Sequence, residues 1–306
     1  MFFTMFRGIA SPTFFFLEKM KSILIDTSNI LYRGFYSFPK HPCGEVFFIL
    51  TTIRSYLNDP DTHVYLCLDG KAKGKQINEE YKANRKHEDA VSVFRHLPYL
   101  VYMLQDLNRV HIKYNPNLEA DEVIFSLTRL LDGDKIIIST DNDLLQSLKE
   151  DTCIQRQDKL INEQYYREEM IQKFHSVTPS RLPIYRAIVG DSSDNLKPPI
   201  PRFPKELAAL IAENIEYDGT APTKENLQQL WDGLKDLTKT KKEKIKLLIE
   251  NYDMFKSNFE IMKLDVHTDL DFQYLKENPV LQSFPPGVMT VYRNIKMLDA
   301  VEKINE

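Results

Sequence analysis

The chain has 306 residues, of which 42% are hydrophobic and 27% charged; this globular composition excludes fibrous and intrinsically disordered classes. The cysteines form no metal-binding pattern and favour a reduced, cytoplasmic protein over a disulfide-rich secreted one; they are Cys43, Cys67 and Cys153. The formal net charge of −4 excludes a uniformly basic nucleic-acid protein, although the distribution of charge matters more than its total.

Residues 1–19 are rich in phenylalanine but interrupted by Arg7, Pro12 and Glu18. The segment is too short and broken to span a membrane, and it lacks the pattern of a signal peptide. Met20 immediately precedes the first expected strand. We therefore interpret residues 1–19 as an extension, either a start assigned too early or a docking tail, and expect no membrane association.

Three apolar runs of strand length each lead into an aspartate. They are residues 22–25 before Asp26, residues 64–68 before Asp69, and residues 135–140 before Asp141. Each run is followed by a helix-like or polar stretch, and this alternation predicts an α/β fold with a mainly parallel central sheet covered by helices. Because ligands bind at the carboxyl ends of such strands, we expect the three aspartates to share one rim.

Three short acidic motifs add six carboxylates: Glu119, Asp121 and Glu122 in residues 118–122, Asp143 in 140–143, and Asp191 and Asp194 in 190–195. Asn117 is a candidate cap for a helix through residues 123–127. On that helix Glu119 and Glu122 are three residues apart and share a face, so Asp121 is expected to point elsewhere, towards a second ion or the solvent.

Nine converging carboxylates would repel one another strongly without counter-charge. Divalent cations that prefer oxygen ligands, Mg²⁺ or Mn²⁺, supply such charge, and two ions a few ångström apart are a common apparatus for cutting phosphodiesters. Setting these nine aside leaves 35 acidic residues against 40 Lys and Arg. Taken singly, each motif is also compatible with a turn, a helix cap or favourable placement at a helix dipole.

A basic segment follows Asp69. Residues 70–75 are lysine-rich, and residues 81–87 combine Tyr81 with Lys82, Arg85 and neighbouring cations. Cations with an aromatic ring suit contact with a nucleic-acid backbone and stacking on a base, and the alternative is a solvated helix face.

The chain divides into four parts by pattern. Residues 1–19 are the extension, 20–160 carry the α/β pattern, 161–272 read as a mostly helical C-terminal subdomain, and 273–306 form a C-terminal extension. Within the subdomain, helical spacing covers residues 205–215, 224–237 and 241–262.

In this order the motifs resemble those of the structure-specific 5′ nucleases, a family that includes flap endonucleases, phage 5′–3′ exonucleases and the 5′-nuclease domain of bacterial DNA polymerase I. The resemblance covers roughly residues 20–272 and is carried by residues 24–35, 81–85, 119–122, 139–146 and 189–195. It implies a PIN-like 5′-nuclease fold with a helical arch at about residues 83–105 and a helix-hairpin-helix-like subdomain.

The resemblance also implies roles. A first metal would be surrounded by Asp26, Asp69, Glu119, Asp121 and Glu122, and a second completed by Asp141, Asp143, Asp191 and Asp194. Lys82 and Arg85 would touch the scissile phosphate as catalytic residues. Arg33 would contact the DNA backbone, and Tyr81 would stack on a base.

Two departures from the family pattern stand out. Glu122 replaces an aspartate, which keeps the carboxylate but changes its reach. The family's glycine-rich hairpin, whose backbone amides hold duplex phosphates and often K⁺, is replaced by proline-rich residues 197–205 without glycine. This argues against a K⁺ site, and shifts duplex binding to the side chains of Lys197, Arg202 and Lys205.

The sequence therefore predicts a two-metal 5′–3′ exonuclease or flap endonuclease of phage-like replication or repair, acting on DNA with flap, nicked or RNA-primed ends. Its partners would be DNA and replication proteins such as a polymerase or a single-strand-binding protein, in the cytoplasm, or the bacterial host cytoplasm if phage-encoded. The alternatives are a catalytically inactive DNA-binding relative, an RNA endonuclease of a related fold and, more distantly, an Asp-x-Asp phosphatase.

Overall fold

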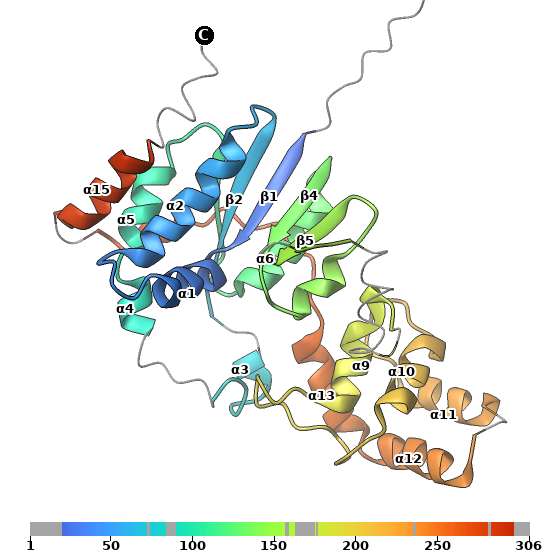
Figure 1. The fold of residues 1–306 in the computed structure, drawn as a ribbon. Helices are drawn as coiled ribbons and strands as arrows, with labels where there is room; N and C mark the ends of the chain where they lie inside the picture. The colour runs from blue at the N-terminus through green and yellow to red at the C-terminus, as the bar shows by residue number, and fades with distance from the viewer. Residues whose placement is uncertain are drawn as a thin grey trace, which may run out of the picture.

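A computed structural model describes residues 20–71, 74–83, 90–156, 159–162, 175, 177–234, 237–280 and 283–296, and only the backbone of residues 75 and 76. A sheet domain carries a helical subdomain below one end of its strands (Figure 1).

The central sheet has the order β3-β2-β1-β4-β5-β6. Its strands are β1 (Lys21–Asp26), β2 (Thr62–Leu68), β3 (Val110–Tyr114), β4 (Asp134–Ile138), β5 (Thr152–Arg156) and β6 (Lys159–Ile161). All neighbours pair in parallel except β5 and β6, which are antiparallel. The predicted mainly parallel sheet is confirmed. The strands that lead to Asp69, Asp26 and Asp141 are β2, β1 and β4, which lie side by side in that order.

Both faces of the sheet are covered, which explains the continuous apolar runs of its strands. Ile23 and Ile25 of β1 face one core, together with α1 (Thr27–Ser37), α2 (Gly44–Leu57) and α5 (Leu97–Leu104). Leu24 faces the other core with α6 (Ala120–Leu130). A Cβ at Gly34 would lie 2.8 Å from the Cα of Glu45, so glycine permits the close packing of α1 on α2.

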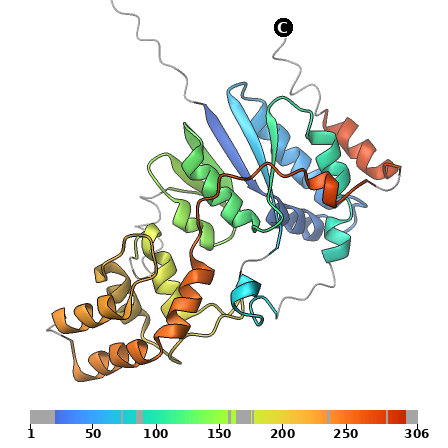
Figure 2. The ribbon, with the colours of Figure 1, turned by 180° about the vertical axis from the view of Figure 1, so that it is seen from behind.

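The C-terminal segment returns to the sheet domain, as Figure 2 shows from behind. Asp271 forms a parallel bridge with Tyr114, and α14 (Tyr274–Glu277) and α15 (Pro286–Ile295) follow. Val288 and Val291 of α15 are buried in the same core as α2. Residues 286–295 therefore complete the sheet domain, and our reading of 273–306 as a separate extension is corrected for this helix.

The connection from β2 to β3 contains α3 (Gly74–Ile77), α4 (Ala90–Phe94) and α5. Leu100 and Leu104 of α5 are fully buried against the sheet. Residues 97–104 are therefore a core helix rather than part of an arch, and the expected arch at 83–105 is too long at its C-terminal end.

The helical subdomain contains η2 (Pro179–Arg181), α9 (Leu182–Val189), α10 (Lys205–Asn214), α11 (Lys224–Gly233), α12 (Lys239–Glu250) and α13 (Tyr252–Met262). The helix expected over 241–262 is two helices, because Asn251 leaves helical geometry with φ −100° and ψ 30°. The carbonyl of Leu247 accepts both the backbone N–H of Asn251 at 3.0 Å and its side-chain amide at 2.9 Å at the end of α12. Within the described residues, we find no helix with the length and hydropathy needed to cross a bilayer.

Candidate active site

The ends of β1, β2 and β4 form an acidic rim. Asp26 is the last residue of β1, and Asp69 and Asp141 follow β2 and β4 closely. Asn29 of α1 donates to the hydroxyl of Thr140 at 2.8 Å, which ties the end of β1 to the residue before Asp141. The predicted convergence of these three residues at one rim is thus a feature of the fold.

Asp26 is 9% exposed and accepts hydrogen bonds from the hydroxyl of Ser139 at 2.7 Å and from the backbone N–H of Asn29 at 3.1 Å. Burial, followed by the charges of Asp69 and Asp141, raises its pKa from 3.8 to about 7. The strand-to-helix turn thus holds a carboxylate where its charge is poorly compensated by the protein.

Asp69 is anchored between two elements. Its Oδ1 accepts from the backbone N–H of Ala120 at 2.9 Å, and its Oδ2 accepts from the hydroxyl of Ser28. These bonds join β2 to the first turns of α6 and α1, so the rim is fixed on two helix N-termini, where negative charge is favoured.

Glu119 precedes α6 and pairs with the ammonium group of Lys82. Burial raises the pKa of Glu119, the charge of Lys82 opposes that rise, and Asp69 and Glu122 add to it. Lys82 itself has φ +56°, a left-handed conformation that turns the basic segment into the rim. The expected catalytic lysine therefore lies among the carboxylates.

The two other acids of this motif point in different directions. Burial and the charges of Glu119, Asp141 and Asp143 raise the pKa of Asp121 well above its usual range, so Asp121 faces the cluster. Glu122 instead folds back onto the backbone N–H of Glu119 at 3.2 Å in a capping box. Its other oxygen lies 3.7 Å from His267 Nε2, so Glu122 lies beside Glu119, as the helical spacing predicts, but is engaged in the helix cap.

Asp143 begins η1 (Asp143–Ser147) and donates its backbone N–H to Asp141 at 2.8 Å. Burial raises its pKa to about 7, with Arg186 opposing the rise and Asp141 and Asp194 adding to it. Arg186 Nη1 lies 2.5 Å from Asp143 Oδ1, and Nη2 pairs with Asp191. Sequence reasoning missed Arg186, whose signal is a single cation inside the apolar run 182–189 just before the Gly190 motif.

Gly190 ends α9 with φ +73°, and a Cβ there would lie 2.6 Å from the carbonyl oxygen of Leu196. Glycine is thus required where the loop folds back so that Asp191 can bridge to Leu196. Further along, Asp194 accepts from the Tyr81 hydroxyl at 3.3 Å, and its carbonyl accepts the Lys82 N–H at 2.9 Å. The acidic loop therefore holds the basic segment in place.

Tyr81 is only 3% exposed. Its ring packs over Gly74, where an added Cβ would meet it at 2.3 Å. The expected stacking of Tyr81 on a base is therefore wrong for this conformation, in which the residue locks the segment that carries Lys82. Arg85 lies outside the described residues. Arg33 is half-buried on α1, with its guanidinium carbon 5.4 Å from the centre of the Phe48 ring.

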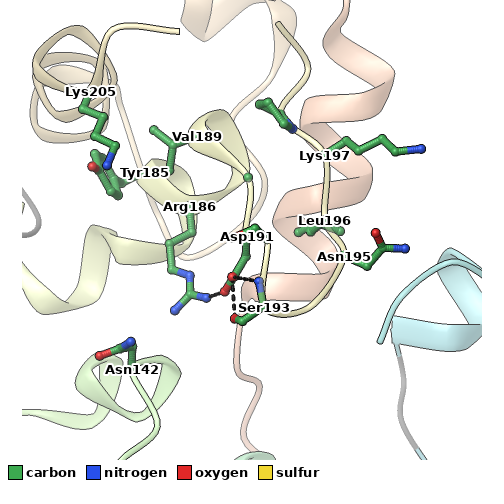
Figure 3. Close-up of a pocket in the computed structure, with 13 residues that line it drawn as sticks. Asn142, Tyr185, Arg186, Val189, Asp191, Ser193, Asn195, Leu196, Lys197 and Lys205 are labelled. Atoms are coloured by element: carbon green, nitrogen blue, oxygen red, sulfur yellow. Dashed lines mark hydrogen bonds and ion pairs between the residues drawn. The ribbon is translucent and has the colours of Figure 1, made fainter. Parts of the chain in front are cut away.

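The cations of the atypical hairpin are exposed. Lys197 pairs with Glu80 at 3.0 Å, and Lys205 begins α10. Arg202 has φ +55°, the left-handed geometry that usually favours glycine. A left-handed residue thus occurs in this turn without glycine, and it carries a cationic side chain. A pocket of about 630 Å³ lies beside this loop, lined by Asn142, Tyr185, Arg186, Asp191, Lys197 and Lys205 among others (Figure 3).

The donor set fits hard divalent cations, because it consists of carboxylates; burial and neighbouring negative charges raise the pKa values of Asp26, Asp121 and Asp143. Over the described ranges, however, no three His, Cys, Asp or Glu side chains converge as ligands of one ion. In this conformation Lys82 pairs with Glu119, and Arg186 pairs with Asp143 and Asp191.

Comparison with known proteins decides the family. Residues 21–175 match the model of the 5′-3′ exonuclease N-terminal resolvase-like domain. The chain belongs to the 5′-3′ exonuclease family. It is 28% identical over 274 residues to the 5′-3′ exonuclease of Aquifex aeolicus, covering 85% of this chain and 86% of that protein. It is 30% identical over 235 residues to DNA polymerase I of Caldicellulosiruptor bescii, covering 71% of this chain but only 27% of the polymerase.

Solved structures show the same fold. The T5 D15 protein crystallised with metal ions aligns with a TM-score of 0.60 and 16% identity, over 92% of this chain and 100% of that one. Human GEN1 in complex with Holliday junction DNA aligns with a TM-score of 0.55 and 12% identity, over 92% of this chain and 67% of that one. The PIN-like 5′-nuclease fold is thus confirmed.

Proposed function

We propose that this protein is a divalent-metal-dependent 5′ nuclease that hydrolyses phosphodiesters in DNA at flaps, nicks or RNA-primed ends. The observation that carries the proposal is the rim of Asp26, Asp69 and Asp141 at adjacent parallel strand ends, with Lys82 reaching into it. Membership of the 5′-3′ exonuclease family supports the reaction class.

In this proposal Asp26, Asp69, Glu119 and Asp121 would hold a first ion, and Asp141, Asp143, Asp191 and Asp194 would hold a second. Glu122 belongs to the first group by sequence, but its capping contact makes it a support for Glu119. When bound, Mg²⁺ or Mn²⁺ supplies positive charge that stabilises the phosphate in the transition state and favours ionisation of the attacking water.

The chain's own groups do the remaining work. Lys82 exchanges Glu119 for a phosphate oxygen and adds a positive charge where negative charge develops. The Tyr81–Asp194 contact keeps the lysine in position. Arg33, Lys197, Arg202 and Lys205 bind the DNA backbone, where each cation contributes to affinity without reading sequence. Arg85 is assigned a phosphate contact from its motif alone.

DNA is the proposed partner. Because the matched DNA polymerase I is a longer chain that contains a region similar to this protein, association with a polymerase during primer removal is part of the proposal. A cytoplasmic location is also proposed, since Cys43, Cys67 and Cys153 are free thiols.

The function is tested by digestion of 5′-labelled flap, nicked and RNA–DNA hybrid substrates with Mg²⁺, beside single-stranded RNA. We expect cleavage of the first three near their 5′ ends and little cleavage of the RNA. Binding without cleavage would indicate an inactive relative, and preferential cleavage of the RNA would indicate an RNA endonuclease.

A further inference from the structure

Arg186 lies among the carboxylates that are proposed to hold the second ion, and it pairs with two of them. It stands on α9, is 8% exposed, and its guanidinium joins Asp143 of η1 to Asp191 of the loop after α9. Figure 3 shows the side chain directed towards Asp191 and the neighbouring Asn142. A buried cation thus occupies the space between two carboxylates from different elements.

The protein also satisfies the remaining oxygen of Asp191. Oδ2 pairs with Arg186, while Oδ1 accepts from the backbone N–H of Ser193 at 2.8 Å and from its hydroxyl at 2.5 Å. Both oxygens of Asp191 therefore have partners from the protein itself. An ion ligated by Asp191 on the Arg186 side would have to replace the guanidinium.

We propose that Arg186 is an exchangeable internal cation, which partly offsets the negative charges of Asp143 and Asp191 in the metal-free protein and competes with a divalent cation for them. The inference rests on the proposed function, because it concerns the second ion of that site. Room for the exchange exists, since Arg186 lines the pocket of about 630 Å³ beside α10.

Competition makes the second ion bind more weakly than the first. Releasing the guanidinium breaks two buried charge contacts, and that cost is subtracted from the binding free energy of the ion. Among the carboxylates proposed for the first ion, Lys82 pairs with Glu119, while Asp26 and Asp69 accept hydrogen bonds from hydroxyl and backbone N–H groups. The first ion therefore meets less competition.

Isothermal titration of the DNA-free protein with Mn²⁺ tests the competition. The variants are Arg186→Gln, which keeps much of the length without the charge, and Arg186→Lys, which keeps the charge but not the two-pronged geometry. Lys205→Gln is the matched control, because it removes an exposed cation that lines the same pocket. Circular dichroism and the melting temperature in chelator establish that each variant is folded.

We expect Arg186→Gln to tighten the second Mn²⁺ by roughly tenfold or more and to leave the first nearly unchanged. Arg186→Lys should lie between the wild type and Arg186→Gln, and Lys205→Gln should match the wild type. If both Arg186 variants bind the second ion as weakly as the wild type or more weakly, Arg186 is a structural bridge and the inference is wrong. That result would say nothing against cleavage of DNA by this protein, so it is distinct from failure of the proposed function.

Discussion

Replacement of Asp26 by asparagine should stabilise the metal-free protein. Folding raises the pKa of this carboxyl from 3.8 to about 7, mainly through burial and then through the charge of Asp69. The folded state therefore binds an extra proton between pH 4 and pH 7, and stability is lost as the pH rises through that range. A shift of this size corresponds to at most about 4 kcal/mol, since one unit is about 1.4 kcal/mol.

Asparagine removes the charge and keeps the hydrogen bonds. Its carbonyl oxygen can still accept from the N–H of Asn29, and its amide can donate to the hydroxyl of Ser139. For a domain of this size about 2–4 °C accompanies each kcal/mol, so we expect Asp26→Asn to melt roughly 5–10 °C above the wild type at pH 8 in chelator.

The assay is thermal unfolding from pH 4 to pH 8, with and without excess Mg²⁺. The advantage of Asp26→Asn should be small at pH 4, grow to about pH 7 and then level off. Excess Mg²⁺ should raise the melting temperature of the wild type more than that of the variant. Asp106→Asn, an exposed aspartate outside the rim, is the control and should not differ from the wild type. A variant that melts at or below the wild type at pH 8 in chelator would refute the reasoning.

Three further predictions concern DNA. Asp141→Asn should lower the single-turnover cleavage rate by roughly 100-fold or more, because losing a metal ligand removes several kcal/mol of charge stabilisation. DNA binding should stay close to that of the wild type. Near wild-type turnover in saturating Mg²⁺ would contradict this prediction. Lys82→Ala should lower the single-turnover rate more than the affinity and Arg33→Ala the affinity more than the rate, and a binding titration showing the reverse would refute their placement. The alanine triple variant of the hairpin cations should flatten the log–log salt slope of duplex binding by roughly two to three units, and an unchanged slope would place the duplex site elsewhere; its positions are Lys197, Arg202 and Lys205.

The rim could be predicted from the sequence because it depends on a local pattern at the end of each strand. Each of Asp26, Asp69 and Asp141 follows an apolar strand, and parallel pairing necessarily brings such strand ends together. The order of the strands in the sheet could not be predicted in this way, but the prediction needed only that the three strands be parallel and end at the same edge.

Helical spacing placed Glu122 beside Glu119 but could not show that Glu122 is engaged in the helix cap. Glu119 and Glu122 do lie three residues apart, but the free N–H groups at the helix start draw Glu122 back to the backbone. Asp121 is then the residue that meets the carboxylates of the β4 end.

The roles of Arg186 and Tyr81 could not be predicted from the spacing of residues along the sequence. The partners of Arg186 are Asp143, on another element, and Asp191, across a loop that turns back at Gly190. Tyr81 looked like a stacking residue beside cations, but the approach of Asp194 and Gly74 buries it. Both depend on tertiary contacts between distant segments, which no local pattern records.

The central claim is that this rim of carboxylates cuts DNA from a 5′ end with divalent cations. The most direct measurement is single-turnover cleavage of a 5′-labelled flap by chelator-treated protein, followed as Mg²⁺ is added. We predict no cleavage in chelator, recovery with Mg²⁺, and products released from the 5′ end near the junction of single and double strand. Cleavage that persists in chelator, or a flap that stays intact at saturating Mg²⁺ while the protein binds it, would contradict the account.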